Sequence, residues 1–542
     1  MINADNSIKV DGLEKSIIEK CKQRIIAIAV IFFVSFIAVN IKLIEVSKPL
    51  KAKDNSDKII KKYSKRGDIL DRNGNIVAIS MPSWSLYKDK NTIYDIETTK
   101  NKLLSIIPNL DKHKLGLILK EDTKNFQYIS RHLSPNVAKN INKIGEPGLN
   151  FKKEYLRVYP YNEEISHIVG FLGTEEDGLA GVEKKYNEIL KSGTNIYLTI
   201  DSRVQFRVYQ ELKKGIDLYK YKAAVGIVLE INTGEVIAGA SLPSFDPNAY
   251  AAFIPTKNKI TNSVYEMGSI FKSFTVASAL NENLVNSNSK FDVREPLKLK
   301  GKTITDYHGE DRILDLEGVF TYSSNIGTAQ IAQILGVDRQ YSYFNNLGFN
   351  RPLDTGIYEA VNPVVIPKNK VKELDSVLMS YGHSINISPM HAISALAATL
   401  NEGEYIEPMV VKDKKYMNRP RIKVFSKQVT ETMKHYYRNV VLEGSAKKIQ
   451  STIYKVGGKT GTSNKFIDGK QDHKKVVSSF ISFFPIDEPK YAVFVLLDEP
   501  KAMEETRVWG RTAGFNAVPI SKNIITQIAP ILGVKSNIHN EL

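Results

Sequence analysis

The chain has 542 residues, which at about 150 residues per domain predicts three to four domains. Its composition, 42% hydrophobic and 25% charged, is typical of a globular protein and excludes collagen-like and wholly disordered chains. A single cysteine, Cys21, excludes a disulfide framework, and the nine histidines include no H-E-x-x-H motif, so no metal or cofactor is expected. The net charge of +16 comes from lysines scattered along the chain, so no nucleic-acid-binding face is predicted.

The first element predicted is a membrane helix near the N-terminus. Ile25–Ile41 contains only two polar residues, Ser35 and Asn40, and reaches the lower length limit for crossing a hydrocarbon core of about 30 Å. The alternatives are a buried helix and a cleaved signal peptide, which would end in a small-x-small cleavage site that this segment lacks. We predict a tail at residues 1–24 and an uncleaved single-pass anchor at residues 25–45. The basic residues on its two sides are too evenly balanced to set its orientation.

The pattern of the chain changes near Asn195. Before this residue, short strand-like runs are broken by the turn signal Asn73-Gly74. After it, Val204–Leu212 has the spacing of a helix, and Ala223–Leu229 with Glu235–Ala240 predicts a hairpin. Two further helices and three strands are predicted at Gly268–Leu280, Asn325–Leu335, Lys455–Ser463, Val476–Phe484 and Tyr491–Leu497. Strands, then helices, then strands indicate an α+β domain, with helices packed on an antiparallel sheet.

A nucleophile and a base are predicted on one helix. Ser269 and Lys272 are three residues apart, so their side chains leave the same face, and Ser269 lies at the helix N-terminus, where the helix dipole stabilises negative charge. The same Ser-x-x-Lys spacing also begins at Ser85, Ser287 and Ser445. Alone, therefore, the motif is a weak signal.

Two later motifs strengthen the prediction. Ser323-Ser324-Asn325 opens a predicted helix, and Lys459-Thr460-Gly461-Thr462 lies on a predicted strand. The alternative for the second motif, the tail of a P-loop, fails because its required first glycine falls on Ile453. Taken in order, the three elements match the Ser-x-x-Lys, Ser-x-Asn and Lys-Thr-Gly combination of penicillin-binding proteins and class A β-lactamases.

The resemblance extends over most of the chain, from about residue 24 to about residue 530. Further segments that carry it are Arg66–Gly74, Arg157–Gly173, Gly178–Tyr186, Leu198–Asp201, Ala240–Asn248 and Tyr265–Lys272. Together they resemble the class B penicillin-binding proteins, which are peptidoglycan D,D-transpeptidases. The sequence departs from that pattern at Met267, where proline is common, and at Ser384 and His391, where glycine and glutamine are common.

The resemblance implies an architecture and a set of roles. Beyond the anchor it implies an elongated mixed pedestal domain of the dimerisation type at residues 46–194, and a transpeptidase domain at residues 195–542 with a central antiparallel sheet flanked by helices. The implied roles are nucleophile for Ser269, general base for Lys272, proton relay for Ser323, a holding role towards Lys272 and the substrate amide for Asn325, and carboxylate binding for Lys459, Thr460, Gly461 and Thr462. Lys459 is also a second cation that would lower the pKa of Lys272. The backbone N–H groups of Ser269 and Thr462 would form the oxyanion hole.

The resemblance also implies substrates, partners and a location. The substrates would be peptidoglycan stem peptides ending in D-Ala-D-Ala, and β-lactams would be inhibitors. The chain would sit in a bacterial cytoplasmic membrane with its catalytic domain outside the cytoplasm, beside a polytopic glycosyltransferase and other division proteins. We favour a division role because only about 130 residues separate Arg66 from Asn195, too few for an extended head region. The alternatives are an elongation-type enzyme, a β-lactam sensor or β-lactamase, and a catalytically silent scaffold.

Overall fold

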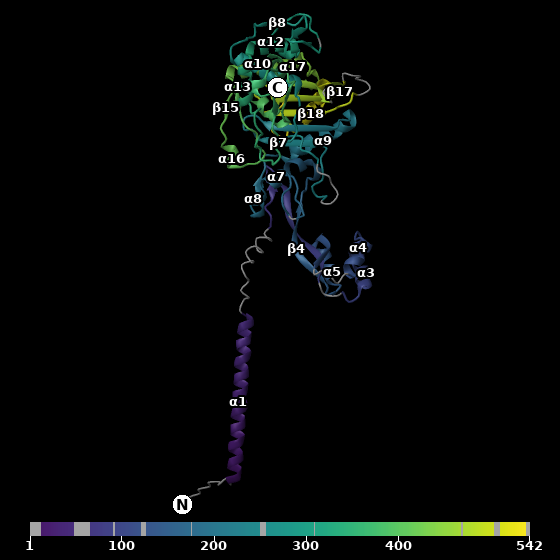
Figure 1. Cartoon of the computed structure of the whole chain (residues 1–542), viewed down its shortest axis with the longest axis vertical. Helices are drawn as coiled ribbons and strands as arrows, with labels where there is room; N and C mark the ends of the chain where they lie inside the picture. Colours follow the sequence, from purple (N-terminus) through teal and green to yellow (C-terminus); the bar gives the residue numbers. More distant parts are fainter. Residues whose placement is uncertain are drawn as a thin grey trace, which may run out of the picture. The chain divides into compact units, whose positions relative to one another are not determined.

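The computed structural model describes residues 12–47, 65–89, 93–120, 126–174, 176–249, 256–307, 309–467, 470–502 and 510–537 (Figure 1). By its internal contacts the chain divides into two compact units, Met1–Ser64 and Lys65–Leu542. Residue 46, the predicted start of the pedestal, still belongs to the helix of the first unit, and residues 1–11 of the predicted tail lie outside the described residues.

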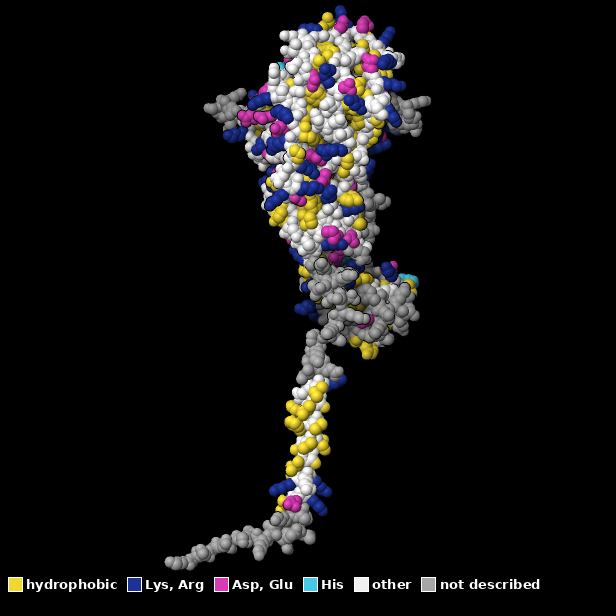
Figure 2. Space-filling view, turned by 60° about the vertical axis from the view of Figure 1, so that its left-hand side comes forward, with side chains coloured by type: hydrophobic (Ala, Val, Ile, Leu, Met, Phe, Trp, Pro, Cys, Tyr) yellow, Lys and Arg dark blue, Asp and Glu magenta, His cyan; other side chains and the backbone are white. Residues whose placement is uncertain are grey.

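The first unit contains one long helix, α1 (Gly12–Ser47). At 1.5 Å per residue its 36 residues extend about 54 Å, longer than the hydrocarbon core of about 30 Å. The stretch Ile18–Lys42 is long and apolar enough to cross a membrane, and none of its most apolar part is buried against the protein. Figure 2 shows hydrophobic side chains along the middle of this helix and basic side chains near both ends of it. The chain thus has the helix that the sequence predicts for a single-pass anchor.

The second unit begins with a mixed sheet in the pedestal. Its strands are β1 (Ile69–Leu70), β2 (Ile76–Asp89), β3 (Phe126–Leu133), β4 (Leu149–Val158) and β5 (Ile196–Tyr197). The long strand β2 pairs antiparallel with β1, β3 and β4, and β1 pairs parallel with β5. The predicted turn separates β1 from β2. There Gly74 has φ +86°, which favours glycine, and the Asp71 carboxylate accepts the N–H groups of Asn73 and Asn75 at 2.8 Å.

Three helices pack near the far end of these strands and form a core of their own (Figure 1). They are α3 (Ile96–Ile106), α4 (Lys112–Lys120) and α5 (Pro135–Asn142). Leu86 of β2 packs there with Leu103 and Leu115 from the helices. This small core is separate from the large one that fills the rest of the unit, so the pedestal has a lobe with its own packing.

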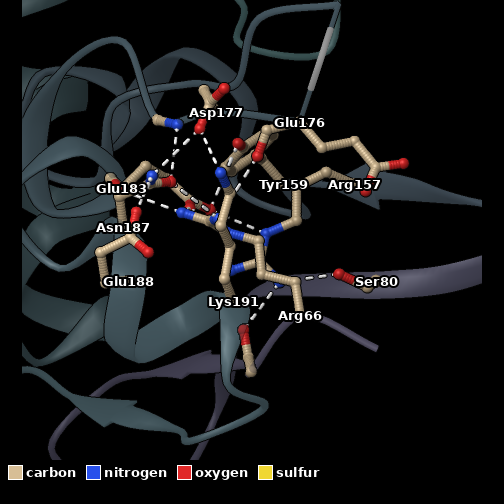
Figure 3. A network of polar contacts seen from close by, with 12 residues as sticks. Arg66, Ser80, Arg157, Tyr159, Glu176, Asp177, Glu183, Asn187, Glu188 and Lys191 are labelled. Atoms are coloured by element: carbon tan, nitrogen blue, oxygen red, sulfur yellow. Dashed lines mark hydrogen bonds and ion pairs between the residues drawn. The ribbon is translucent and has the colours of Figure 1, made fainter. Parts of the chain in front are cut away.

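A buried cluster of charges connects the start of the pedestal to its short helices. These helices are α6 (Ser166–Val169), α7 (Gly181–Lys185) and α8 (Asn187–Lys191), and the turn η1 (Asn162–Glu164) precedes them. The carboxylate of Glu183, on α7, accepts Nε of Arg66 at 2.8 Å and Nε of Arg157 at 2.7 Å (Figure 3). Arg157 also donates to the carbonyl oxygen of Gly67, and Arg66 to the side chain of Asn187. We call these residues the Arg66–Glu183–Arg157 cluster. It joins segments more than a hundred residues apart in the chain.

The second sheet is the centre of the unit and is wholly antiparallel. Its order is β16 (Gly457–Ile467), β17 (Lys470–Phe484), β18 (Tyr491–Asp498), β6 (Ala223–Glu230) and β7 (Val236–Leu242). Every residue of β18 is buried, and because successive side chains of a strand point to opposite faces, both faces of the sheet are covered. The predicted hairpin and the three predicted C-terminal strands are all members of this sheet, which confirms the α+β prediction.

Helices from distant parts of the chain cover this sheet. α9 (Ser202–Tyr219) packs on β7 and on α18 (Ala517–Ile528), whereas α15 (Pro389–Ala397) and α17 (Lys427–Leu442) pack on β18 and β16. The helices α10 (Lys272–Asn281), α11 (Leu316–Thr321), α12 (Asn325–Leu335), α13 (Val337–Asn346), α14 (Glu373–Ser380) and α16 (Lys414–Met417) form the rest of the helical region. Short strand pairs border it: β8 (Lys290–Asp292) with β11 (Ile313–Asp315), β9 (Leu297–Leu299) with β10 (Lys302–Ile304), β12 (Val364–Val365) with β13 (Ile385–Asn386), and β14 (Glu404–Tyr405) with β15 (Ile422–Lys423). The remaining short turns are η2 (Gly268–Phe271), η3 (Lys368–Lys370), η4 (Lys447–Ile449) and η6 (Ala513–Phe515).

Candidate active site

The segment that carries Ser269 begins as a 3-10 turn. The predicted helix at 268–280 is η2 followed by α10, and the backbone N–H of Lys272 donates to the carbonyl oxygen of Ser269. In a 3-10 turn, side chains three residues apart lie one above the other. The turn therefore places the Ser269 hydroxyl and the Lys272 amine on one side of the segment. Within the described residues no hydrogen bond ties down the Ser269 hydroxyl.

Ser323 lies in a strained turn between α11 and α12. Its φ of +61° is in the left-handed region, which costs a residue with a side chain about 1–3 kcal/mol. The next residue, Ser324, caps α12 by accepting the N–H of Gly327 at 2.9 Å. The turn carries the Ser323 hydroxyl to the helix that bears Lys272 and to the strand that bears Lys459.

The Ser323 hydroxyl is shared by two lysines. Nζ of Lys459, on β16, donates to Ser323 Oγ at 2.9 Å, and Nζ of Lys272 donates to the same oxygen at 3.1 Å and to the Ser323 carbonyl oxygen. A serine hydroxyl has two acceptor lone pairs and one proton to donate. While both lone pairs accept from the lysines, the Ser323 proton is left to be donated to a third group. This is the arrangement that a proton relay requires.

The two lysines share a buried environment. Both side chains are completely buried. Burial, together with the nearby Lys459 amine, lowers the pKa of Lys272 well below its ordinary 10.5, and burial lowers the pKa of Lys459 to about 7. Desolvation disfavours the charged amine, and a second positive charge beside Lys272 disfavours it further. A lysine that loses its proton near neutral pH can act as a general base.

Strand β16 forms the edge of the sheet and packs closely against the segment that precedes Ser269. Ser463 Oγ donates to the carbonyl oxygen of Glu266 at 2.7 Å. A side chain at Gly461 would place a carbon 2.4 Å from the Met267 carbonyl oxygen, so only glycine permits this approach. The Thr460 hydroxyl is hydrogen bonded to Ser445 Oγ at 2.5 Å. The contacts of Ser463 and Gly461 place the Lys-Thr-Gly-Thr motif beside the residues that precede Ser269.

One expected contact is not made. The Asn325 side-chain amide donates to the carbonyl oxygen of Thr305 at 2.9 Å, and among the described residues it makes no hydrogen bond to Lys272. The Lys272 amine donates instead to both oxygens of Ser323. The structure thus brings Lys272, Ser323 and Lys459 together and holds Asn325 beside them through Thr305.

Two polar residues contact the site without being marked by any sequence motif assigned to it. Asp306 holds the start of α12, and Ser445 bonds Thr460. Ser445 begins one of the other Ser-x-x-Lys matches, and Asp306 lies in a segment without apolar periodicity. The sequence therefore predicts no role at the site for either residue. Within the described residues no group of His, Cys, Asp or Glu side chains is placed to hold a metal ion.

The unusual residues near the nucleophile have structural roles. Ser384 has φ +59°, a conformation that favours glycine, and its N–H donates to Glu266 Oε1 at 2.9 Å. His391 is buried and hydrogen bonded to Ser388 Oγ and to the carbonyl oxygen of Arg351. Met267 is buried against the core. These departures therefore change local packing and leave the three-residue hydrogen-bonded set intact.

Comparisons with known proteins agree with this architecture. Residues 224–526 match the family described as Penicillin binding protein transpeptidase domain, and residues 61–216 match the family described as Penicillin-binding Protein dimerisation domain. The probable peptidoglycan D,D-transpeptidase FtsI of Caulobacter vibrioides is 35% identical over 487 residues, covering 87% of this chain and 82% of the relative. Stage V sporulation protein D of Bacillus subtilis is 27% identical, covering 89% of this chain and 81% of the relative.

A solved structure shares the fold. The crystal structure of penicillin binding protein 2X from Streptococcus thermophilus superposes with a TM-score of 0.71, at 20% sequence identity, over 87% of this chain and 81% of that one. The two matched families span most of the chain, and the alignment with the Caulobacter relative covers 87% of it. The chain therefore belongs to the class B penicillin-binding proteins, the family of peptidoglycan D,D-transpeptidases.

Proposed function

We propose that this chain cross-links peptidoglycan stem peptides through an acyl-enzyme on Ser269, in septal wall synthesis. The observation that carries the proposal is the Ser323 hydroxyl, which accepts hydrogen bonds from two buried lysines of lowered pKa. Such an arrangement has no structural advantage, because burying two amines together costs free energy. Its use is to hold and move protons beside a nucleophile.

In the first half-reaction, neutral Lys272 takes the hydroxyl proton of Ser269. The Ser269 oxygen then forms a bond to the carbonyl carbon of the penultimate D-Ala of a stem peptide. The bond to the terminal D-Ala nitrogen breaks, the Ser323 proton moves to the leaving amine, and Ser323 is reprotonated from Lys272. The chain is left acylated on Ser269, and free D-Ala leaves.

In the second half-reaction an amine of another stem peptide attacks the acyl carbon. Ser323 accepts the proton of the attacking amine and passes it through Lys272 back to the Ser269 oxygen, so the new amide forms as the ester breaks. In both halves the backbone N–H groups of Ser269 and Thr462 would stabilise the oxyanion. The edge motif, with Lys459, Thr460, Gly461 and Thr462, would bind the carboxylate of the terminal D-Ala, and Asn325 would orient the peptide amide.

The membrane arrangement follows from the substrate. We propose a cytoplasmic tail at residues 1–24, an anchor at residues 25–45 and a catalytic domain outside the cytoplasm, where stem peptides are cross-linked. For the domains we propose a pedestal at residues 46–194 and a transpeptidase domain at residues 195–542. The packing of α9 on β7 supports a boundary before α9.

The proposed partners are a polytopic glycosyltransferase and other division proteins. A polytopic glycosyltransferase would make the glycan strands, and the anchor helix and the pedestal would contact it and other division proteins. The short stretch between Arg66 and Asn195 and the FtsI relative support division over elongation. Depletion of the protein in its host should give long cells that replicate DNA without septa. Swelling into spheres that still form septa would contradict the division role.

Acylation is tested with a labelled penicillin on the full-length chain in detergent. The wild type should gain the mass of one adduct, and Ser269→Ala should gain none, because the attacking oxygen is gone. Ser287→Ala is the matched control, since Ser287 begins an exposed Ser-x-x-Lys match, and it should label like the wild type. An adduct that persists in Ser269→Ala would refute the assignment of the nucleophile.

A further inference from the structure

Asp306 holds the turn that carries Ser323. Its Oδ1 accepts the backbone N–H groups of Asn325 and of Ile326, the latter at 3.0 Å, and its Oδ2 accepts the Ser324 hydroxyl at 2.7 Å. The neighbouring Thr305 carbonyl oxygen accepts the Asn325 side chain. One short segment before β11 thus binds three consecutive residues, Ser324, Asn325 and Ile326, the first two of which belong to the Ser-Ser-Asn motif. A carboxylate at a helix N-terminus also interacts favourably with the helix dipole.

These bonds fix a residue that would otherwise relax. Ser323 directly precedes the clamped residues and has φ +61°, so its conformation persists only where the surroundings enforce it. Its N–H donates to the Phe320 carbonyl oxygen at 3.2 Å on one side, and the Asp306 clamp holds the other side. The direction of the Ser323 hydroxyl, and with it the hydrogen bonds from Lys272 and Lys459, depends on both.

Asp306 is also the negative charge of the site. Among the described residues, the charged groups that act on the Lys272 amine are Lys459 from β16 and Asp306 from the loop before β11. Lys459 lowers the pKa of Lys272, and Asp306 raises it. The carboxylate therefore opposes the effects of burial and of the second lysine, and it limits how far the pKa of the base falls.

We propose that Asp306 is a positioning residue of the transpeptidase reaction, which holds the Ser323 turn in place and supplies the charge that balances the Lys272–Lys459 pair. This rests on the proposed acylation of Ser269. Among the described residues the hydrogen bonds of Asp306 reach Ser324, Asn325 and Ile326, not the side chains assigned to the chemistry. It acts through Ser323, by geometry, and through Lys272, by charge.

Two substitutions separate the roles. Asp306→Asn keeps an oxygen for the N–H groups of α12 and removes the charge, whereas Asp306→Ala removes both. The matched control is Asp315→Asn, because Asp315 caps α11 through the N–H of Gly318 at 2.8 Å and is not among the groups that act on Lys272. The measurement is the rate of acylation by penicillin against pH, on the full-length chain in detergent, with circular dichroism to show that each variant is folded.

For Asp306→Asn we expect the rising, acidic side of the pH profile to move to lower pH. Without the carboxylate the pKa of Lys272 falls further, so the base is neutral at lower pH. For Asp306→Ala we expect at least a tenfold loss of the maximal rate, because the Ser323 turn is released. Asp315→Asn should follow the wild-type profile.

Two results would overturn the proposal: an Asp306→Asn profile that coincides with that of the wild type, or an Asp306→Ala maximal rate within twofold of it. A wild-type chain that penicillin never acylates would instead refute the function on which the proposal rests. The two failures are therefore distinguishable in one set of measurements.

Discussion

Two buried charge clusters of this chain are built in opposite ways. In the Arg66–Glu183–Arg157 cluster of the pedestal, unlike charges meet at 2.7–2.8 Å, and further donors of the two arginines reach Asn187, Ser80 and backbone carbonyl oxygens (Figure 3). In the transpeptidase domain, two lysines with no exposed surface converge on one serine hydroxyl.

The difference distinguishes a structural use of buried charge from a chemical one. Pairing a buried carboxylate with two guanidinium groups gives each charge a partner of opposite sign and ties distant segments together. Burying two amines together disfavours their charged forms, and the Asp306 carboxylate opposes this only in part, so the pKa of both amines is lowered. The first cluster should therefore matter for stability and little for acylation, and the second should matter for acylation at a cost in stability.

The largest effect is expected for Lys272→Ala. The acylation rate should fall by about 10²–10⁴-fold, the range that a general base contributes, because Lys272 is the base that takes the Ser269 proton in the proposed mechanism. The stability should not fall with it, since a costly buried amine is removed. Stopped-flow acylation and thermal unfolding of the same sample measure both. Lys290→Ala, in the exposed Ser-x-x-Lys match that begins at Ser287, is the control and should be acylated at the wild-type rate. Acylation of Lys272→Ala at a near wild-type rate would overturn the role of Lys272 as the base.

The next effect is expected for Glu183→Gln in the pedestal cluster. Removing this charge leaves Arg66 and Arg157 buried without their common partner, which typically costs about 3–5 kcal/mol. Denaturant unfolding should detect this loss, and the folded variant should still be acylated. Glu188→Gln, on an exposed side chain of the next helix, α8, is the control and should change stability little. If Glu183→Gln lost acylation while keeping its stability, the cluster would not be structural.

The smallest effect concerns the pH dependence of stability and Lys459. Burial lowers the pKa of Lys459 from 10.5 to about 7, so between these values the unfolded chain binds the proton and the folded chain does not. The cost of burying this lysine is full below about pH 7 and disappears as pH rises towards 10.5. Lys459→Met should therefore be more stable than the wild type at pH 7, by a margin that shrinks by pH 10.

The control for that measurement lies on the same strand. Lys465 donates to Asp498 at 2.8 Å and to Glu499 at 2.9 Å, and these carboxylates raise its pKa. Lys465→Met should accordingly destabilise the protein at pH 7, opposite in sign to Lys459→Met. Melting temperatures of the three proteins from pH 7 to pH 10 test this. A Lys459→Met variant less stable than the wild type at pH 7 would contradict the expected cost of the buried amine.

The elements predicted best from the sequence are those whose local pattern agrees with their final environment. Asn325–Leu335 is α12 with the same ends, because Ser324 supplies a cap and Gly336 a stop. The sequence predicts a helix at Val204–Leu212, whereas the helix in the structure is longer, Ser202–Tyr219. The prediction ends too early because the C-terminal half of the helix carries charges on its exposed side and has weak apolar periodicity. The Ser269 helix begins as a 3-10 turn, which no local pattern signalled.

The sequence by itself determined the anchor helix, the antiparallel sheet and the order of the three motifs, because apolar periodicity, turn residues and motif spacing are local properties. Only the tertiary structure decided that Lys272 and Lys459, 187 residues apart in the chain, share the Ser323 hydroxyl. It also decided that Asp306 clamps the Ser323 turn and that Asn325 bonds Thr305. These contacts join segments whose separation in sequence carries no period, and they form only because the sheet and its helices fix the distances between them.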